Sequence, residues 1–329
     1  MQPFTFNTVR QIVNAPGSAL ALAEHCRRLG VQRPLLVTDP GLMAIGLVPP
    51  VIAAIEEAGL VLTVFDQVRE DPPEETVMAA RELAASAEVD GVVAVGGGSS
   101  MDVAKVVATL LAGEQALADM YGVDQVAGGR LPLILVPTTA GTGSEVTPVA
   151  VITTGATTKA GVSSAVLLPD IAVLDADLTL GLPPAVTAMT GVDAMVHAIE
   201  AYTSRHRKNP VSDNLARQAL VLLGGNIRTA VHNGADRDAR ANMLLGATLA
   251  GQAFANAPVA AVHALAYPLG GHYHIPHGLS NSLVLPSVLE FNASAAADLY
   301  AELAEIIVGA PVAGSAEAKT TAMIAAMRQ

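Results

Sequence analysis

The chain has 329 residues, of which 51% are hydrophobic and 15% charged, and it contains a single cysteine. This length predicts two domains of about 100 to 200 residues each, and the composition excludes a disordered chain. One cysteine excludes a disulfide framework within the chain and favours a reducing, cytoplasmic setting. The net charge of −12, without any run of basic residues, leads us to expect no nucleic-acid partner and no binding to anionic membranes. The first residues lack the pattern of a secretion signal, and no apolar run reaches the roughly 18 residues of a membrane helix.

The first half of the chain alternates short apolar runs with longer helical patterns. The apolar runs predict strands at 31–38, 60–65, 91–95 and 131–136. The segments between them predict helices at 41–58, at 73–87 and from Ser100 onward. Because the strands are apolar throughout rather than alternating, they are typical of a parallel sheet covered by helices on both faces. We therefore predict a doubly wound α/β fold for this half.

Strand patterns stop after about Leu180. Helical patterns then follow at 183–202, 211–232, 236–256 and 259–269. The prolines Pro183 and Pro184 mark the boundary, because proline can open a helix but cannot continue a central strand. We expect an α/β domain over residues 1–180 and an all-helical domain over 181–329.

Two glycine-rich loops follow predicted strands. The first contains Gly96-Gly97-Gly98, and the free N–H groups at the following helix start favour the negative charge of a phosphate. Met101 stands where the dinucleotide fingerprint has its third glycine, so a tight turn without a ligand stays an alternative. The second loop, 137–145, follows the strand at 131–136. Two such loops at the carboxyl ends of parallel strands favour a shared nucleotide crevice, whereas neither loop fits a serine hydrolase or a P-loop NTPase.

Asp39 ends the first predicted strand, directly before Pro40. An acidic side chain at this position can accept hydrogen bonds from a ribose diol and would repel the 2′-phosphate of NADP. This favours NAD over NADP. An aspartate that merely opens a turn before proline is equally common, and that alternative stays open.

The helical half contains a possible metal-binding group. Asp193 and His197 are four residues apart, which places both on one face of a helix, and Ala and Val residues surround them. A buried aspartate needs a compensating charge, although a surface ion pair is the alternative. Carboxylate and imidazole ligands suit Fe²⁺ or Zn²⁺ better than Ca²⁺ or Mg²⁺. Four of the eight histidines fall within fifteen residues: His263, His272, His274 and His277.

These motifs together resemble the iron-containing (group III) alcohol dehydrogenases. The resemblance rests on 96–99, 137–145, 191–200, 262–271 and 276–278, and it runs in order from the first strand to about Asn292. It implies a dinucleotide-binding domain followed by a helical domain, in a dehydroquinate synthase-like architecture, with NAD and one divalent metal, Fe²⁺ before Zn²⁺. It also implies a homodimer. By position in the family motifs, the implied metal ligands are Asp193, His197, His263 and His277. The implied cofactor contacts are Asp39, Gly97, Gly98, Ser99, Thr138, Thr139 and Thr142.

Two features depart from the family pattern. Many members have a histidine four residues after the third metal ligand that is thought to relay protons, and Tyr267 stands there in this chain. With an ordinary pKa of about 10, a tyrosine is a poorer acid–base group near neutrality, so His272, His274 or a water chain are alternatives for the relay. The candidate catalytic residues are Tyr267 and His277. The chain also stops at Gln329, which predicts a C-terminal truncation relative to the family.

The resemblance implies a metal-dependent NAD(H)-linked oxidoreductase. Its substrate would be a small alcohol or hydroxy acid, interconverted with an aldehyde, ketone or oxo acid by hydride transfer. Maleylacetate reductase-type activity is an alternative. Another is a dehydroquinate synthase-like cyclase, for which Arg205, Arg207 and Lys208 could bind a phosphate, although a solvated helix end also accounts for that cluster. A silent nucleotide-binding protein is the third alternative.

Overall fold

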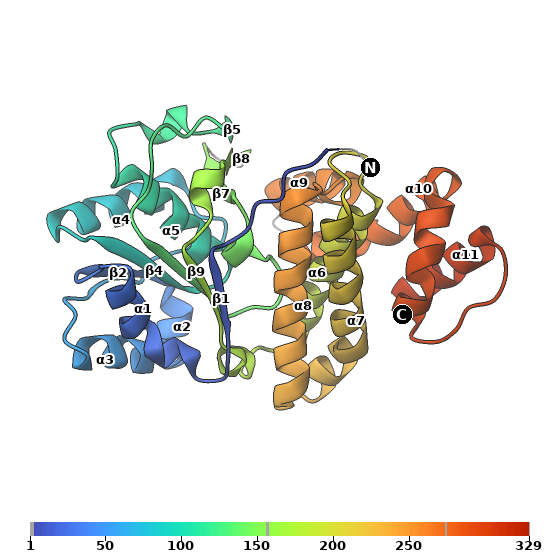
Figure 1. The fold of residues 1–329 in the computed structure, drawn as a ribbon, viewed down its shortest axis with the longest axis horizontal. Coiled ribbons are helices and arrows are strands. Elements are labelled where there is room, and N and C mark those ends of the chain that lie inside the picture. Colours follow the sequence, from blue (N-terminus) through green and yellow to red (C-terminus); the bar gives the residue numbers. More distant parts are fainter. Residues whose placement is uncertain (1–2, 156–157, 274, 329) are drawn as a thin grey trace. The chain divides into compact units, whose positions relative to one another are not determined.

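The computed structural model of the chain describes residues 3–155, 158–273 and 275–328. The chain forms two compact units. We call the first the α/β unit; it comprises Thr8–Thr139 and Ser144–Thr179. The second, the helical unit, comprises Leu180–Gln329 together with Met1–Asn7 and Ala140–Gly143. Each unit has its own architecture (Figure 1).

A parallel sheet forms the centre of the α/β unit. Among the described residues it has six strands in the order β1-β9-β6-β4-β2-β3, and every neighbouring pair is parallel. The strands are β1 Gln11–Asn14, β2 Pro34–Val37, β3 Thr63–Phe65, β4 Gly91–Gly96, β6 Leu133–Pro137 and β9 Ile171–Leu174. In β2, β4 and β6 every residue is buried, which explains why these runs lack polar alternation.

Helices cover both faces of this sheet. They are α1 Leu22–Arg28, α2 Pro40–Ala44, α3 Pro49–Glu57, α4 Glu74–Ser86 and α5 Gly98–Leu110. Successive side chains of β4 enter different cores: Val92 packs in one cluster with residues of α4 and α5, whereas Val93 packs in another with residues of α1 and α3. Figure 1 shows the same division of the helices between the two faces. The doubly wound fold predicted from the sequence is therefore confirmed.

Several elements differ from the sequence prediction. β1 and β9 add two strands that were not predicted: β1 has only two apolar residues, between Gln11 and Asn14, whereas β9 is a fully buried apolar run that was missed. Among the described residues, a second sheet of three strands combines β5 Gly122–Val123 with the antiparallel pair β7 Val149–Thr154 and β8 Thr158–Ser163. The helical stretches predicted over 41–58 form two helices, because Gly46 (φ 76°) ends α2 in the left-handed conformation before Pro49 opens α3.

The helical unit contains α6 Pro184–Thr203, α7 Pro210–His232, α8 Arg237–Asn256, α9 Ala261–Tyr273, α10 His277–Val308 and α11 Ala316–Met327. Local capping sets several of its boundaries. Asn209 accepts a hydrogen bond from the Ser212 N–H at the start of α7, and Asp236 accepts one from the Ala239 N–H at the start of α8. The all-helical prediction for this part of the chain is confirmed. None of the described helices is long and apolar enough to cross a membrane.

Candidate metal centre and cofactor loops

Four side chains of the helical unit converge on one point. Asp193 and His197 come from α6, His263 from α9, and His277 is the first residue of α10. One ligand atom from each lies within 4.8 Å of the others. Asp193, His197 and His263 are buried, whereas the His277 side chain is 33% exposed. The structure thus brings together all four residues that the sequence singled out, although they span 85 positions, from 193 to 277.

The close approach of α10 to α6 depends on a glycine. A Cβ atom at Gly278 would lie 2.4 Å from the carbonyl oxygen of Met189 on α6, which is shorter than any side chain tolerates. With glycine there, the start of α10 packs directly on the α6 backbone. This packing places His277 Nε2 3.6 Å from Asp193 Oδ1.

Glu200 orients one of the histidines. Its carboxylate, also on α6, accepts hydrogen bonds from the Val262 N–H at 2.7 Å and from His263 Nδ1 at 2.6 Å. A carboxylate acceptor fixes the proton on Nδ1 and leaves the lone pair on Nε2, which faces Asp193 at 3.9 Å. In the sequence Glu200 stood out only as part of a motif, and this contact was missed. Its spacing of seven residues from Asp193, two helical turns, was the available signal.

Asn281 is a second residue that sequence reasoning missed. It lies on α10 four residues after His277 and is fully buried. Its Nδ2 donates to Asp193 Oδ1 at 2.6 Å. The spacing of four from His277 places both on one face of the helix and was the available signal.

The cluster combines buried carboxylates with imidazoles. Burial lowers the pKa of His197 to about 4, against the opposing effect of Asp193, so this ring is neutral near neutral pH. Burial raises the pKa of Asp193, but the neighbouring imidazoles outweigh it, and the pKa lies below its ordinary value. In Glu200 burial acts in the same direction, but the hydrogen bond and charge of His263 together with two backbone N–H donors outweigh it, so that pKa is also lowered. Two ionised carboxylates in a buried site favour a cation.

These residues fit a divalent transition metal. One carboxylate and three imidazoles form a donor set that suits Fe²⁺ or Zn²⁺. Within the described part of the chain, Nδ1 of His197 is buried and has no hydrogen-bond partner. Leaving such an atom unpaired costs about 1–3 kcal/mol, which is consistent with a site that is completed by a further group.

The candidate proton-relay residues lie in different settings. Tyr267 on α9 is 42% exposed, and its ring centroid is 5.9 Å from that of His277. His272 is exposed in the last turn of α9. His274 lies outside the described residues. Tyr267 therefore lies beside the cluster, and its role in proton transfer stays a prediction.

Most of the predicted cofactor residues share one edge of the sheet. β2, β4 and β6 are parallel neighbours, so the loops that follow them emerge on the same side (Figure 1). Asp39 follows β2, Gly97 to Ser99 follow β4 and open α5, and Thr138 and Thr139 follow β6. A Cβ atom at Gly97 would meet only Thr139, at 3.9 Å, so the glycine leaves space between the two loops. The N–H groups of the first turn of α5 have no intrahelical acceptor and suit a phosphate.

Two of the predicted cofactor residues have other structural roles or settings. Asp39 Oδ1 accepts a hydrogen bond from the Leu42 N–H at 3.0 Å and caps α2. One of the two carboxylate oxygens therefore has the turn-opening role that the sequence left as an alternative. Thr142 belongs to the Ala140–Gly143 segment of the helical unit, unlike the other six residues. In that segment Gly143 has a φ of 62°, and a Cβ there would lie 2.6 Å from the Gly251 Cα on α8.

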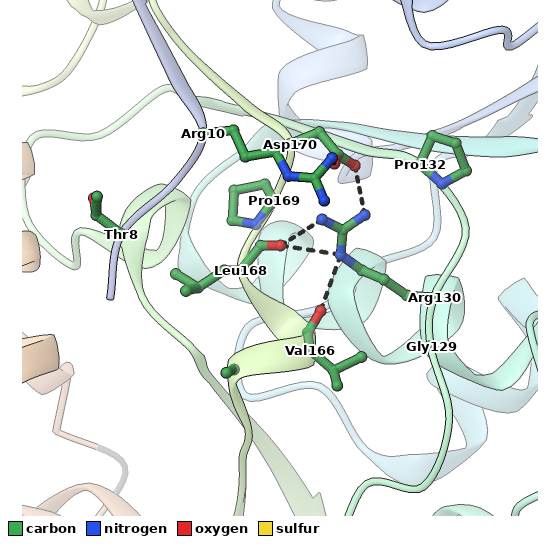
Figure 2. Close-up of a pocket in the computed structure, with 10 residues that line it drawn as sticks. Thr8, Arg10, Gly129, Arg130, Pro132, Val166, Leu168, Pro169 and Asp170 are labelled. Atoms are coloured by element: carbon green, nitrogen blue, oxygen red, sulfur yellow. Dashed lines mark hydrogen bonds and ion pairs between the residues drawn. The ribbon is translucent and has the colours of Figure 1, made fainter. Parts of the chain in front are cut away.

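A pocket of about 490 Å³ lies elsewhere in the α/β unit (Figure 2). Arg130 lines it and donates hydrogen bonds to the carbonyls of Val166 and Leu168 and, at 2.6 Å, to Asp170. Arg10 contacts the other oxygen of Asp170 at 3.3 Å. None of the predicted site residues lines this pocket. The network ties the segment before β9 to the sheet and is structural.

Comparison with known proteins identifies the family. The model for iron-containing alcohol dehydrogenase matches residues 10–176, and the model for the C-terminal part of that family matches 187–329. Long-chain-alcohol dehydrogenase 1 of Geobacillus thermodenitrificans is 45% identical over 84% of this chain and 70% of its own length. A crystal structure of 1,3-propanediol oxidoreductase superposes with a TM-score of 0.96 at 36% identity, over 99% of this chain and 86% of that one. Sulfoacetaldehyde reductase from Bifidobacterium kashiwanohense, solved in complex with NAD⁺, gives 0.89 at 30% identity, over 100% and 85%. Two family models that together span nearly the whole chain confirm the resemblance seen in its motifs, and the protein belongs to the iron-containing alcohol dehydrogenase family.

Proposed function

We propose that this enzyme interconverts a small alcohol or hydroxy acid with its carbonyl product, using NAD(H) and one divalent metal ion held by Asp193, His197, His263 and His277. Membership of the family makes the chain an NAD-linked oxidoreductase of alcohols and aldehydes. The observation that carries the ligand assignment is the convergence of four donor atoms from three helices within 4.8 Å. Fe²⁺ is the proposed ion because the family is iron-containing, although the donors also suit Zn²⁺.

The protein's own side chains orient the proposed metal ligands and place a proton donor beside them. When bound, a divalent ion supplies Lewis-acid catalysis at the substrate oxygen, and NAD supplies the hydride acceptor. Glu200 keeps the proton of His263 on Nδ1, so that Nε2 is free to ligate. Tyr267 lies beside His277, where its hydroxyl can hold or pass a proton between the substrate oxygen and solvent.

The proposed NAD site uses both glycine loops. Gly97, Gly98 and Ser99 would bind the diphosphate through the N-terminal turn of α5, and Asp39 would accept hydrogen bonds from the adenosine ribose. Thr138, Thr139 and Thr142 complete the proposed contacts. We also propose domain limits of 1–180 and 181–329, a cytoplasmic location supported by the single buried cysteine, and a homodimer by analogy with the family.

The cyclase alternative receives no support from its candidate phosphate-binding residues. Lys208 Nζ donates to Asp213 at 2.8 Å and lies over the Tyr202 ring, so its charge is already engaged. Arg205 and Arg207 are exposed after the end of α6, as expected for a solvated helix end. Maleylacetate reductase-type activity stays an alternative, because it would use the same metal and cofactor residues.

Metal analysis and a substrate screen test the proposal. Protein purified under reducing, anaerobic conditions should carry about one Fe²⁺ or Zn²⁺ per chain and produce NADH from NAD⁺ with members of a panel of small alcohols, diols and hydroxy acids. The variant His263→Ala should lose metal and turnover while retaining NAD binding. The control His232→Ala changes an exposed histidine in the last turn of α7, to which no role is assigned, and should keep all three properties. An active, metal-free His263→Ala protein would reject the ligand assignment.

A further inference from the structure

Asn281 contacts three of the four proposed ligand atoms. Besides donating to Asp193 Oδ1 at 2.6 Å, its Nδ2 lies 3.3 Å from His263 Nε2 and 3.3 Å from His277 Nε2. The side chain is 0% exposed, so water does not compete for these contacts. One buried carboxamide therefore lies against the carboxylate and against two of the three imidazoles.

The chemistry of the amide determines what these contacts select. A carboxamide nitrogen has two N–H donors and no acceptor, so one N–H makes the short hydrogen bond to Asp193 Oδ1 and a single N–H is left facing the two ring nitrogens. The Glu200 carboxylate holds the proton of His263 on Nδ1, so the Nε2 atom of that ring faces the amide.

The other end of the same amide supports this orientation. Within the described residues, Asn281 Oδ1 is buried without a hydrogen-bond partner, which is unfavourable. Turning the amide over would place that oxygen against the Asp193 carboxylate and the two lone pairs, which is repulsive. The hydrogen bond that Nδ2 donates to Asp193 therefore fixes the orientation of the amide. The buried Oδ1 is left without a partner as a consequence.

We propose that Asn281 is a positioning residue of the metal centre. It holds the Asp193 carboxylate in one orientation, beside the Nε2 atoms of His263 and His277. This inference rests on the proposed metal site and adds to it a fifth residue that does not ligate. Hydrogen-bonded partners of this kind fix ligand orientation, and their removal weakens metal binding by about 10–100-fold.

A buried asparagine elsewhere in the helical unit provides the matched control. Asn256 is 5% exposed, and its Nδ2 donates to the carbonyls of Asn7 and Gln252, away from the cluster. Leucine has the same number of side-chain heavy atoms and no polar atoms, so Asn281→Leu and Asn256→Leu both remove a buried amide. Only the first removes contacts with the proposed ligands.

The test uses metal-free full-length protein titrated with Co²⁺ and Zn²⁺. Affinity is measured by competition with a chromophoric chelator, the ligand geometry by the visible absorption spectrum of bound Co²⁺, and folding by the thermal unfolding of the metal-free form. We expect Asn281→Leu to bind about 10–100-fold more weakly with an altered Co²⁺ spectrum, and Asn256→Leu to match the wild type in both.

Each result decides the question. Wild-type affinity and an unchanged Co²⁺ spectrum in Asn281→Leu would overturn the inference, as would an equal loss of affinity in Asn256→Leu. If Asn281→Leu does not fold, Asn281→Ser replaces it, because the shorter hydroxyl cannot span to Asp193 and carries the same expectation. Failure of the wild type to bind either ion would instead refute the proposed metal site itself.

Discussion

A buried lysine links two segments of the α/β unit and allows a quantitative prediction. Lys105 on α5 is fully buried, and its Nζ donates to Ser144 Oγ and to the Val149 carbonyl, both at 2.7 Å. Asp102, one turn earlier, accepts from Ser144 Oγ and from the Val151 N–H. The pair therefore fastens the 144–151 segment to the helix whose first turn we assign to the cofactor diphosphate.

The magnitude follows from the separation of the charges. Lys105 Nζ lies 3.7 Å from Asp102 Oδ1, which at an effective dielectric constant of about 20 corresponds to an attraction of about 4.5 kcal/mol. Burial lowers the pKa of Lys105 to about 8 despite Asp102, which shows that desolvation of the ammonium offsets part of this attraction. Removing one partner of a buried ion pair lowers the free energy of unfolding by about 3–5 kcal/mol. Because desolvation of Lys105 offsets part of the attraction, we expect Lys105→Met to lower it by about 3 kcal/mol.

Calorimetry and hydrogen exchange can measure this loss. About 3 kcal/mol corresponds to a Tm lower by about 6–12 °C, and peptides from 144–151 should exchange faster in the native state. Lys159→Met is the matched control, because Lys159 pairs with a half-exposed Asp71 at 2.6 Å and such a pair contributes at most about 1 kcal/mol. Equal losses in the two variants, or unchanged exchange at 144–151, would refute the reasoning.

Three further predictions concern single side chains. Glu200→Gln should weaken metal binding about 10–100-fold in chelator competition, because the new amide can donate to His263 Nδ1 and move the ring proton onto Nε2; unchanged affinity would contradict the orienting role. Burial raises the pKa of Asp170, but the hydrogen bonds from Arg130 and the Leu133 N–H and the two arginine charges together outweigh it and the pKa is lowered, so its stabilisation is complete above the ordinary value and lost as pH falls through the folded value. Asp170→Asn should therefore lower the free energy of unfolding near pH 7 by more than near about pH 3, and a pH-independent difference in denaturant titrations would count against the ion pair. Burial raises the pKa of Cys26 to about 12, so iodoacetamide should label it slowly in the native protein and rapidly in denaturant; fast native labelling would show that the thiol is accessible.

Features set by local chemistry were predictable from the sequence. The fully buried strand β4 lies within one residue of its predicted range, because an apolar run followed by glycines is a local signal. The starts of α7 and α8 lie within one residue of prediction for the same reason, since Asn209 and Asp236 cap the helices that follow them. Asp193 and His197 could be named because a carboxylate and an imidazole on one face of an apolar helix need a partner for their polar groups, and a shared ion supplies one.

Features that depend on long-range packing were not predictable in this way. Glu200 and His263 are 63 residues apart, and Asn281 and Asp193 are 88 apart, so no local window contains either contact. Glutamate and asparagine are also common on helices for many reasons, and their residue type alone does not indicate a role at a metal centre. The edge strand β1 pairs with β9, about 160 residues later, and with only two apolar residues it has no distinctive local pattern.

Helix α6 explains why these long-range contacts hold together. It carries two proposed ligands, Asp193 and His197, and also Glu200, so three groups of the centre share one rigid backbone. The other elements are then placed against that helix: α9 through the Glu200 hydrogen bonds, and α10 through the contact that Gly278 allows with the α6 backbone. Because each added ligand is fixed to the same helix, the geometry of the centre depends on two interhelical contacts rather than on four independent positions. A donor set drawn from 85 positions of chain can thus be held ready for a single ion.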